Sequence, residues 1–256
     1  MYQIRHNKFY TSICLLAKNE NNYINEWLDW HLNKLKFDHV YIYDNESDIP
    51  IIDSVDKIYH DRITFLVWRK CDYGLIMQDA CYRHFIRTFK NENKWVAFID
   101  ADEFIRTIDN IPINDFLIEY EPYNGLFIEW LMYNANGQYL ESAEPVRERF
   151  KTTIDYSNKP FTGKCIIKVN EFTDMFPHWP KNCTTQYKVV DSDKKIYYPT
   201  EAKTNSPSDK IVIDHYFTKS YEEWHKKLAR GSCHILKRRL EEFFDFNPDM
   251  KLKEDE

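Results

Sequence analysis

The sequence predicts an α/β protein with a Rossmann-like, mostly parallel central sheet and helices on both of its faces. Three observations support this prediction. Apolar, β-rich runs alternate with amphipathic helical patterns through roughly the first hundred residues. The run at 95–99 is apolar without polar alternation, which is typical of a central strand covered on both faces. The chain has 256 residues, enough to bury the core of one such domain.

The first half of the chain supplies the regular part of this fold. Strands are predicted at residues 11–17, 40–43, 63–68 and 95–99, and helices at 23–35 and 78–89. Strand–helix–strand alternation favours parallel pairing, and such sheets bind ligands beyond the carboxyl ends of their strands. We therefore expect the polar residues that follow these strands to line one edge of the sheet.

The second half is less regular. Strand-like pieces at 125–137, 163–169 and 210–217 are separated by polar loops that contain Pro, and the tail is helical and charged at 220–231 and 234–244. We find no internal repeat and no low-complexity segment. The simplest organisation is a single domain over residues 1–256.

Composition excludes several classes of function. Only 5 Gly are present, so neither G-x-G-x-x-G nor a Walker-type loop occurs, and a bound phosphate must be held by metal and cationic side chains. The formal charge of −6 argues against nucleic acid as a partner. The Lys-rich helices near the C-terminus leave room for peripheral contact with an anionic membrane surface.

The cysteines and the N-terminus indicate the compartment. The six cysteines form no C-x-x-C pair and several lie in apolar runs, as reduced core thiols do: Cys14, Cys71, Cys81, Cys165, Cys183 and Cys233. The N-terminal sequence lacks the pattern of a signal peptide, and no apolar run approaches eighteen residues. We therefore expect a cytoplasmic protein, with contact at the inner face of the membrane as a variant of that expectation.

The stretch WVAFIDADEF at 95–104 is the strongest motif. It places Asp100, Asp102 and Glu103 within four positions at the end of an apolar strand. Carboxylates this close repel one another, and a cation between them relieves the repulsion. The alternative is a strand that simply runs into a polar loop, but Asp-x-Asp after a buried strand favours a metal site.

Several stretches together resemble a known family. ICLLAKNENNYINEWLDWHLNKLKFDHVYIYDNES, WVAFIDADEF and HYFTKSYEEWHKKLARG resemble bacterial members of glycosyltransferase family 92, sometimes grouped with family-2-like transferases, over roughly residues 11–231. The resemblance implies a GT-A fold, a nucleotide-sugar donor, Mn²⁺ (or Mg²⁺) and inversion at the anomeric carbon. One departure is that Val169 leads into Asn170 and Glu171, where such enzymes tend to have Pro and then Gly.

The resemblance also suggests roles for the parts of the chain. About 1–110 would bind the nucleotide sugar, about 111–220 the acceptor, and about 221–256 would form C-terminal helices. The donor would be a UDP-sugar, with UDP-galactose as one candidate. The acceptor would be a glycan or lipid-linked glycan of a bacterial surface polysaccharide, such as capsule or lipopolysaccharide.

A metal would neutralise the nucleoside diphosphate that leaves in such a transfer. Asp102 is the first-choice ligand, and Asp100 would bind the ribose, a metal-bound water or the metal. We expect the next ligand to be His215, which ends a predicted strand, with His178 as the alternative; one imidazole favours Mn²⁺. The structural alternatives are a strand-end histidine for His215 and a surface loop or acceptor contact for His178.

Other side chains would hold the donor. These candidates are Asn19, Glu20, Asp44, Gln78, Asp100, Lys219 and Arg230. Lys219 and Arg230 would bind phosphate as cations, while Asn19, Glu20 and Asp44 would contact uracil and ribose. Asn and Asp also cap helices and close turns, so a structural role stays open for Asn19 and Asp44.

The acceptor side offers less evidence. Trp130 would present a ring face to a sugar, and Asn134 and Asn136 would hydrogen-bond its hydroxyl groups, although a Trp is more often part of a core. Inversion needs a general base near the acceptor hydroxyl. The candidates are Glu148 and, as alternatives, Glu144 and Glu141. An ion pair of Glu148 with Arg149 would make Glu148 structural instead.

Two other functions compete with glycosyl transfer. Phosphatases of the haloacid-dehalogenase type also place Asp-x-Asp after an apolar strand, but on the first strand, whereas the motif here follows the fourth. A transferase-like protein that only binds sugars is the second alternative. Release of a nucleoside diphosphate from nucleotide sugars, compared with release of phosphate from monoesters, distinguishes these functions.

Overall fold

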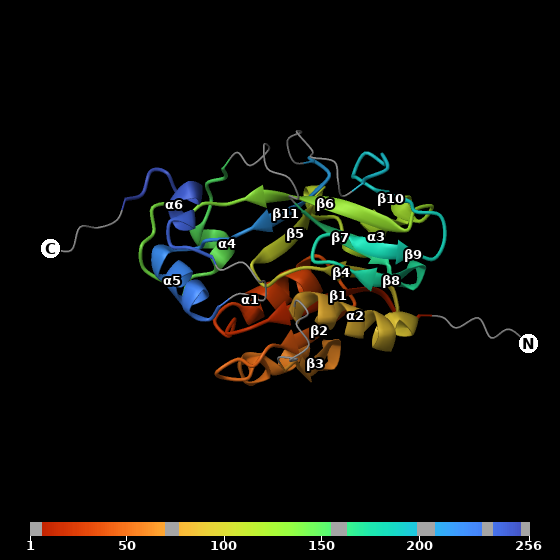
Figure 1. The fold of residues 1–256 in the computed structure, drawn as a ribbon, viewed down its shortest axis with the longest axis horizontal. Coiled ribbons are helices and arrows are strands. Elements are labelled where there is room, and N and C mark those ends of the chain that lie inside the picture. Colours follow the sequence, from red (N-terminus) through yellow and green to blue (C-terminus); the bar gives the residue numbers. More distant parts are fainter. Residues whose placement is uncertain (1–6, 70–76, 155–162, 199–207, 232–237, 252–256) are drawn as a thin grey trace, which may run out of the picture.

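The computed structural model describes residues 7–69, 77–154, 163–198, 208–231 and 238–251. Within these residues the main sheet has nine strands (Figure 1). Their order is β3 (Ile63–Val67), β2 (His39–Asp44), β1 (Phe9–Ala17), β4 (Asn93–Phe98), β7 (Gly163–Lys168), β6 (Gly125–Met132), β11 (Ile211–His215) and β5 (Glu103–Thr107), with the short β10 (Val189–Val190) paired to β6.

Most strands of this sheet run in one direction. Strands β3, β2, β1 and β4 pair in parallel, and β6 and β11 pair in parallel with each other. Strand β7 is antiparallel to both β4 and β6, so β6 and β11 point the same way as β4, and only β7 and β5 are reversed. The predicted mostly parallel α/β sheet is confirmed. The carboxyl ends of β1, β2, β4, β6 and β11 therefore meet at one edge.

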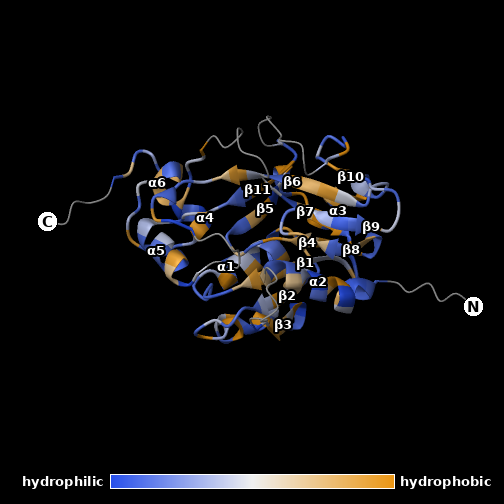
Figure 2. Cartoon of the chain, viewed as in Figure 1, coloured by the Kyte–Doolittle hydropathy of each residue, from blue (hydrophilic) through white to orange (hydrophobic). Residues whose placement is uncertain are grey.

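Helices cover both faces, as predicted. Because side chains alternate along a strand, Ile13 and Leu15 of β1 face a cluster that includes α1 (Ile24–Leu28), while Cys14 faces α2 (Met77–Phe89). A hairpin of β8 (Phe172–Met175) and β9 (Pro180–Cys183) packs beside α2. The helices α3 (Ile113–Leu117) and α4 (Val146–Arg149) belong to the α1 side. In Figure 2 the apolar colour covers much of β6, whereas the β8–β9 hairpin is largely in the hydrophilic colour.

The predicted helix at 23–35 is not uniform. It consists of α1 followed by a π-helical turn over Asp29–Lys34, in which the amide of Leu35 donates to the carbonyl of Trp30 at 2.9 Å. Such turns often mark a place where side chains have a special task. Here Trp30 and His31 of the π-helical turn, together with Trp27 of α1, contact strand β5.

Strand β5 lies at the end of the sheet and was not predicted, because it begins directly after the acidic motif. The indoles of Trp27 and Trp30 donate to the carbonyls of Glu103 (2.9 Å) and Ile105 (2.7 Å). The amide of Ile105 donates to His31 Nε2 at 3.3 Å. These contacts satisfy backbone groups that an uncovered edge strand would leave unpaired. The EWLDWH segment thus fixes the strand that follows the acidic motif.

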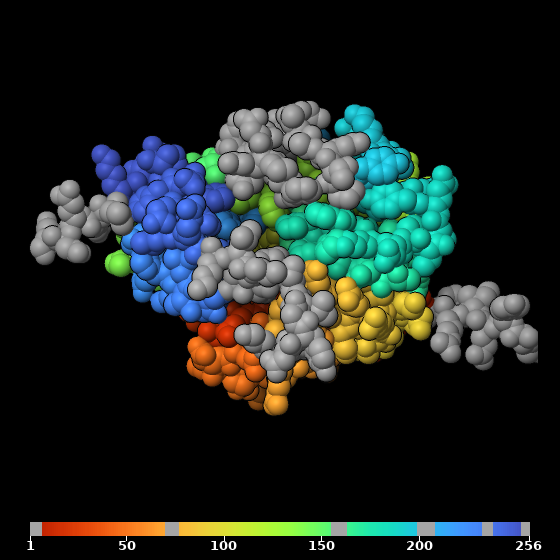
Figure 3. Space-filling model, in the orientation of Figure 1, coloured from red at the N-terminus to blue at the C-terminus, as the bar shows by residue number. Residues whose placement is uncertain are grey.

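The C-terminal helices form a separate small core. Helix α5 (Tyr221–Ala229) starts at a capping box in which Ser220 and Glu223 bond each other's amides, and its Trp224 packs with Phe243 of α6 (Glu242–Phe246). In Figure 3 this blue segment and the teal β8–β9 hairpin lie at opposite ends of the visible face. The predicted helix at 220–231 is confirmed by α5, whereas residues 234–237 of the second predicted helix lie outside the described residues.

Two smaller predictions concern cysteines and membranes. Cys14, Cys81 and Cys165 are buried free thiols and Cys183 is partly exposed, while Cys71 and Cys233 lie outside the described residues. Among the described helices, none has the length and apolar character needed to cross a bilayer.

Candidate active site

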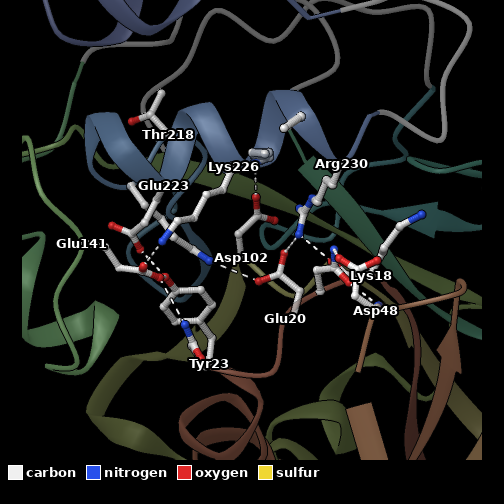
Figure 4. A pocket seen from close by; sticks show the side chains of 15 residues that line it. Lys18, Glu20, Tyr23, Asp48, Asp102, Glu141, Thr218, Glu223, Lys226 and Arg230 are labelled. Atoms are coloured by element: carbon white, nitrogen blue, oxygen red, sulfur yellow. Dashed lines mark hydrogen bonds and ion pairs between the residues drawn. The ribbon is translucent and has the colours of Figure 1, made fainter. Parts of the chain in front are cut away.

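A pocket of about 550 Å³ lies at the carboxyl edge of the sheet, beside α5 (Figure 4). Its wall combines the loop after β1, the acidic motif and the segment from Thr218 to Arg230. The charged side chains that line it are Lys18, Glu20, Asp48, Asp102, Glu141, Lys219, Glu223, Lys226, Lys227 and Arg230. This mixture gives a polar cavity in which cations from α5 face carboxylates from the sheet edge.

Asp102 is the acidic-motif residue that reaches this pocket. Its Oδ2 lies 2.6 Å from Lys227 Nζ, and its Oδ1 lies 3.7 Å from His215 Nε2. Burial raises the pKa of the Asp102 carboxyl, but the charge of Lys227 and the nearby His215 outweigh it and hold this pKa well below its usual range. Asp102 is therefore a carboxylate with one basic partner on each oxygen.

His215 ends β11 and lies opposite Glu103 of β5. Burial lowers the pKa of its imidazole, which favours the neutral ring, and the buried Nδ1 has no hydrogen-bond partner. The His215 ring packs against the Trp130 ring, with the two ring centres 4.6 Å apart. His178 contacts the same Trp130 ring at 5.3 Å, and its Nδ1 donates to Gly163 O at 3.0 Å. The expected approach of His215 to Asp102 is therefore observed, whereas the described contacts of the His178 ring are with Gly163 of β7, Trp130 and Trp179.

Asp100 faces a different set of partners. Its Oδ1 accepts from Gln78 Nε2 at 2.6 Å, and its Oδ2 pairs with Lys164 Nζ at 2.8 Å. Glu103 Oε2 accepts from the Asp100 amide at 2.9 Å. Burial raises the pKa of Glu103 well above its usual range, which favours the protonated carboxyl. The crowding of the three acids is thus relieved by Lys164 on Asp100 and Lys227 on Asp102, and burial favours the uncharged form of Glu103.

The donor set at Asp102 decides which metal arrangement fits. Within the described residues, no three His, Cys, Asp or Glu side chains converge as metal ligands. Asp102 and His215 offer one carboxylate oxygen and one neutral imidazole nitrogen, which suits Mn²⁺. Cations in phosphate chemistry commonly have only one or two protein ligands, with phosphate and water as the others. The pair fits a cation shared with a diphosphate, and it does not fit a closed protein cage.

Glu20 organises the two cations that were expected to bind phosphate. Lys219 Nζ lies 3.2 Å from Glu20 Oε2, and Arg230 pairs with Glu20 Oε1 and donates to the carbonyl of Lys18 at 2.6 Å (Figure 4). Burial raises the pKa of Glu20, but Lys219 and Arg230 outweigh it and the net pKa is lowered. Lys219 Nζ also lies 3.5 Å from the centre of the Tyr23 ring. Glu20 therefore positions cations in this structure.

Asn19 and Asp44 order the loop after β2. Asn19 donates to Asp48 Oδ2 and accepts from the Asp48 amide, each at 2.9 Å. Both carboxylate oxygens of the buried Asp44 accept backbone amides, from Ser47 and Ile51, at 2.9 Å. Asn19 lines the pocket, whereas Asp44 does not. The turn-closing role left open from the sequence is thus what the structure shows for Asp44.

The three candidate bases lie in different surroundings. Glu148 pairs with Lys151 at 3.0 Å and its side chain is 71% exposed, away from the pocket lining. Its helix α4 is anchored elsewhere, since the Val146 amide donates to Glu26 Oε2 at 2.7 Å. Glu144 is also exposed. Of the three, the pocket lining includes Glu141 alone.

Glu141 and Arg149 have partners that the sequence did not indicate. Glu141 Oε1 lies 2.9 Å from the Tyr23 hydroxyl, which is also 2.5 Å from Glu223 Oε1 and donates its one proton to either, and Glu141 Oε2 pairs with Lys226. Arg149 forms a buried ion pair with Glu223 at 2.7 Å. The alternative in which Arg149 forms an ion pair with Glu148 is therefore wrong, because Arg149 pairs with Glu223 and Glu148 pairs with Lys151.

The other acceptor candidates hold a turn. Asn134 Oδ1 accepts from the Asn136 amide at 2.9 Å, and Asn136 Oδ1 accepts from Thr152 Oγ1 at 2.7 Å. Neither Asn134 nor Asn136 lines the pocket, and Trp130 lies beside His215 with its buried Nε1 lacking a hydrogen-bond partner. Trp130 does not line the pocket either, so the structure does not bring the three acceptor candidates to it.

Sequence reasoning missed Lys227, Lys164, Tyr23 and Glu223. A signal existed for two of them, because Glu223 and Lys227 are spaced by four residues and share one face of the predicted helix. For Lys164 the signal was a lone lysine inside an apolar strand, which needs a buried acid.

The fold and pocket together define a class of protein. It is an α/β protein whose sheet presents carboxylates and cations where the strand order reverses between β1 and β4, the position at which such sheets bind nucleotides. The model of glycosyltransferase family 92 matches residues 8–241, most of the chain. The chain belongs to glycosyltransferase family 92.

Similar proteins are known from plants. The glycosyltransferase family 92 protein of Oryza sativa subsp. japonica is 27% identical over 110 residues, which cover 42% of this chain and 18% of that protein. The one of Ricinus communis is 30% identical over 105 residues, which cover 40% and 18%. The aligned part is thus less than a fifth of the length of these relatives.

Solved structures show a distant likeness. The 4-diphosphocytidyl-2C-methyl-D-erythritol synthase of Anaerococcus prevotii DSM 20548 has 9% identity and a TM-score of 0.40, over 78% of this chain and 94% of that one. The apo structure of the bifunctional glycosyltransferase WbbM has 10% identity and a TM-score of 0.32, over 50% and 24%.

Proposed function

We propose that this chain transfers a sugar from a nucleotide-sugar donor to a glycan acceptor, with a divalent cation held by Asp102 and His215. The observation that carries the proposal is that Asp102, which lies beside His215, lines one pocket together with Lys219, Lys227 and Arg230. The family supports glycosyl transfer as the chemistry. The cation, the donor and the acceptor are parts of the proposal.

The leaving group explains why cations gather here. A nucleoside diphosphate departs with growing negative charge on its phosphate oxygens, and preorganised cations stabilise that charge. Mn²⁺ bound at Asp102 would supply Lewis-acid stabilisation of the diphosphate. Lys219 and Arg230 are already oriented by Glu20, so little reorganisation is needed when the charge develops. The pocket of about 550 Å³ is in the size range of small-molecule sites.

Glu141 is the base that we propose for inversion. Burial raises its pKa, but the hydrogen bonds from Lys226 and Tyr23 outweigh it and lower the net pKa, so Glu141 is a carboxylate that can accept a proton. A general base must lie within hydrogen-bond reach of the attacking hydroxyl. Glu141 and Asp102 line the same pocket, so one ligand complex can touch both.

The biological setting belongs to the proposal as well. The resemblance to bacterial members favours a UDP-sugar, with UDP-galactose as one candidate, and a surface polysaccharide or lipopolysaccharide acceptor. A cytoplasmic location with peripheral contact at the inner membrane would give access to a lipid-linked glycan.

A panel of donors tests this function. Nucleoside diphosphate release is measured from UDP-, GDP- and dTDP-sugars, each with MnCl₂ or with EDTA, and with Asp102→Asn as the control. The proposal expects Mn²⁺-dependent release from a UDP-sugar by the wild type alone. Preferred release from a GDP-sugar would contradict the uridine assignment, and release of phosphate from p-nitrophenyl phosphate without any sugar-nucleotide activity would contradict glycosyl transfer.

A further inference from the structure

We propose that Lys227 is a resident counter-ion of Asp102 that leaves this carboxylate when a divalent cation binds, and that it then binds the diphosphate of the donor. The inference rests on the proposed function, because it takes Asp102 as the cation ligand. Its structural basis is the ion pair between Lys227 Nζ and Asp102 Oδ2 at 2.6 Å, in which each side chain is 10% exposed.

The contacts of Lys227 show an ammonium held in place. Besides Asp102, it donates to the carbonyl of Phe217 at 2.6 Å, and it lies 4.3 Å from the centre of the Phe217 ring. Both hydrogen-bond partners carry negative charge or a negative dipole. Lys227 thus neutralises the Asp102 carboxylate at Oδ2, the oxygen next to the one that faces His215.

A divalent cation and the Lys227 ammonium would repel each other if both bound the buried Asp102 carboxylate. A divalent ion between Asp102 Oδ1 and His215 Nε2, which lie 3.7 Å apart, would be only a few ångströms from an ammonium on Oδ2. Like charges at that separation repel strongly in a partly desolvated site. The cation therefore binds weakly while Lys227 stays on Asp102.

The pocket provides a second partner for Lys227. Lys219 and Arg230 line the same cavity and form the proposed diphosphate site. A lysine carries its charge on a flexible four-carbon stem, so it can exchange one anionic partner for another nearby. Arrival of the diphosphate releases Asp102 for the cation, and the two ligands then bind cooperatively, each raising the affinity of the other.

The test compares two adjacent lysines. Lys226 lines the pocket next to Lys227, but it pairs with Glu141 and Glu222 and is 56% exposed. Mn²⁺ affinity without nucleotide, followed by electron paramagnetic resonance, should be about tenfold tighter in Lys227→Met than in the wild type, and unchanged in Lys226→Met. Affinity for inorganic pyrophosphate, measured by calorimetry, should be about tenfold weaker in Lys227→Met. Unchanged Mn²⁺ or pyrophosphate affinity in Lys227→Met overturns the inference.

A measurement on the wild type covers the case in which Lys227→Met does not fold. Acetic anhydride labelling is quantified at each lysine by mass spectrometry, and saturating Mn²⁺ alone should raise labelling of Lys227 at least threefold without changing Lys226. Unchanged labelling of Lys227 overturns the inference.

Asp102→Asn separates this inference from the proposed function. Mn²⁺ affinity equal to that of the wild type in Asp102→Asn would overturn the cation assignment and the inference together. If Asp102→Asn weakens Mn²⁺ affinity but Lys227→Met leaves it unchanged, the inference alone is overturned and the cation assignment stands.

Discussion

His215 Nε2 lies 3.7 Å from Asp102 Oδ1, although the two residues come from opposite halves of the chain. The pairing of β11 with β5 produces this proximity, because His215 is in register with Glu103, the neighbour of Asp102. The sheet thus delivers an imidazole and a carboxylate to one point at its carboxyl edge.

The first prediction concerns this imidazole. His215→Ala should weaken Mn²⁺ binding in the presence of UDP about tenfold or more, because it removes a nitrogen donor and leaves Asp102 as the one protein ligand. Calorimetric titration with MnCl₂ measures the effect. His178→Ala is the matched control, since its imidazole contacts the same tryptophan from another position. A larger loss in His178→Ala than in His215→Ala would transfer the ligand role to the loop.

The second prediction concerns phosphate binding. Lys219→Met should raise the dissociation constant of UDP roughly ten- to hundred-fold, since a charge-assisted contact contributes about 1.5–3 kcal/mol. Lys194→Met is a suitable control, because Lys194 also has a positive φ but pairs with Glu119 at the surface. UDP affinity that is equal in the two variants would contradict the role of Lys219.

The third prediction separates the candidate bases. Glu141→Gln should lower kcat about 10²- to 10⁴-fold while UDP binding stays within a factor of two or so, because a general base acts on the acceptor and not on the donor. Glu148→Gln, on the exposed side of α4, should lower kcat far less. Steady-state kinetics with a saturating donor measures both. The reverse order of effects would restore Glu148 as the base.

Much of this arrangement could be predicted, and the reasons for the rest are physical. Strand periodicity identified seven of the strands, and the carboxyl-edge rule placed Asn19, Glu20 and Asp102 along one edge, where all three line the pocket. Strand β5 escaped prediction because it begins directly after the acidic motif and its partners, strand β11 and the indoles of Trp27 and Trp30, are distant in the sequence.

Partner choice was harder to predict than position. The sequence places Glu20 and Asp44 at strand ends, but it does not show that Glu20 pairs with two cations or that Asp44 accepts two backbone amides. Likewise, helical spacing alone does not tell which of Lys226 and Lys227 turns inward. These outcomes depend on the packing of α5 against the sheet edge, which is a tertiary property.

The fourth prediction concerns acid stability. Burial lowers the pKa of His31 to about 3. Between about pH 6.5 and pH 3, the His31 imidazole is therefore protonated in the unfolded chain and neutral in the folded protein. Folding stability should therefore fall as the pH drops from about 6.5 toward 3, by about 1.4 kcal/mol per pH unit for this group. Urea unfolding of His31→Gln between pH 7 and 5 should show a shallower loss than the wild type. The exposed His225→Gln is the control, and equal slopes in all three proteins would contradict the assignment.

The most direct test of the account is donor cleavage by Asp102→Asn. UDP release from a UDP-sugar is measured in Mn²⁺ for the wild type and the variant, with circular dichroism to confirm that the variant is folded, since Lys227 loses its partner. We predict that the wild type releases UDP in Mn²⁺ and not in EDTA. The rate of UDP release by the folded variant in Mn²⁺ should be about a thousand-fold lower than that of the wild type. A folded Asp102→Asn protein with a rate within tenfold of the wild type would contradict the claim that Asp102 holds the cation at which the donor is cleaved.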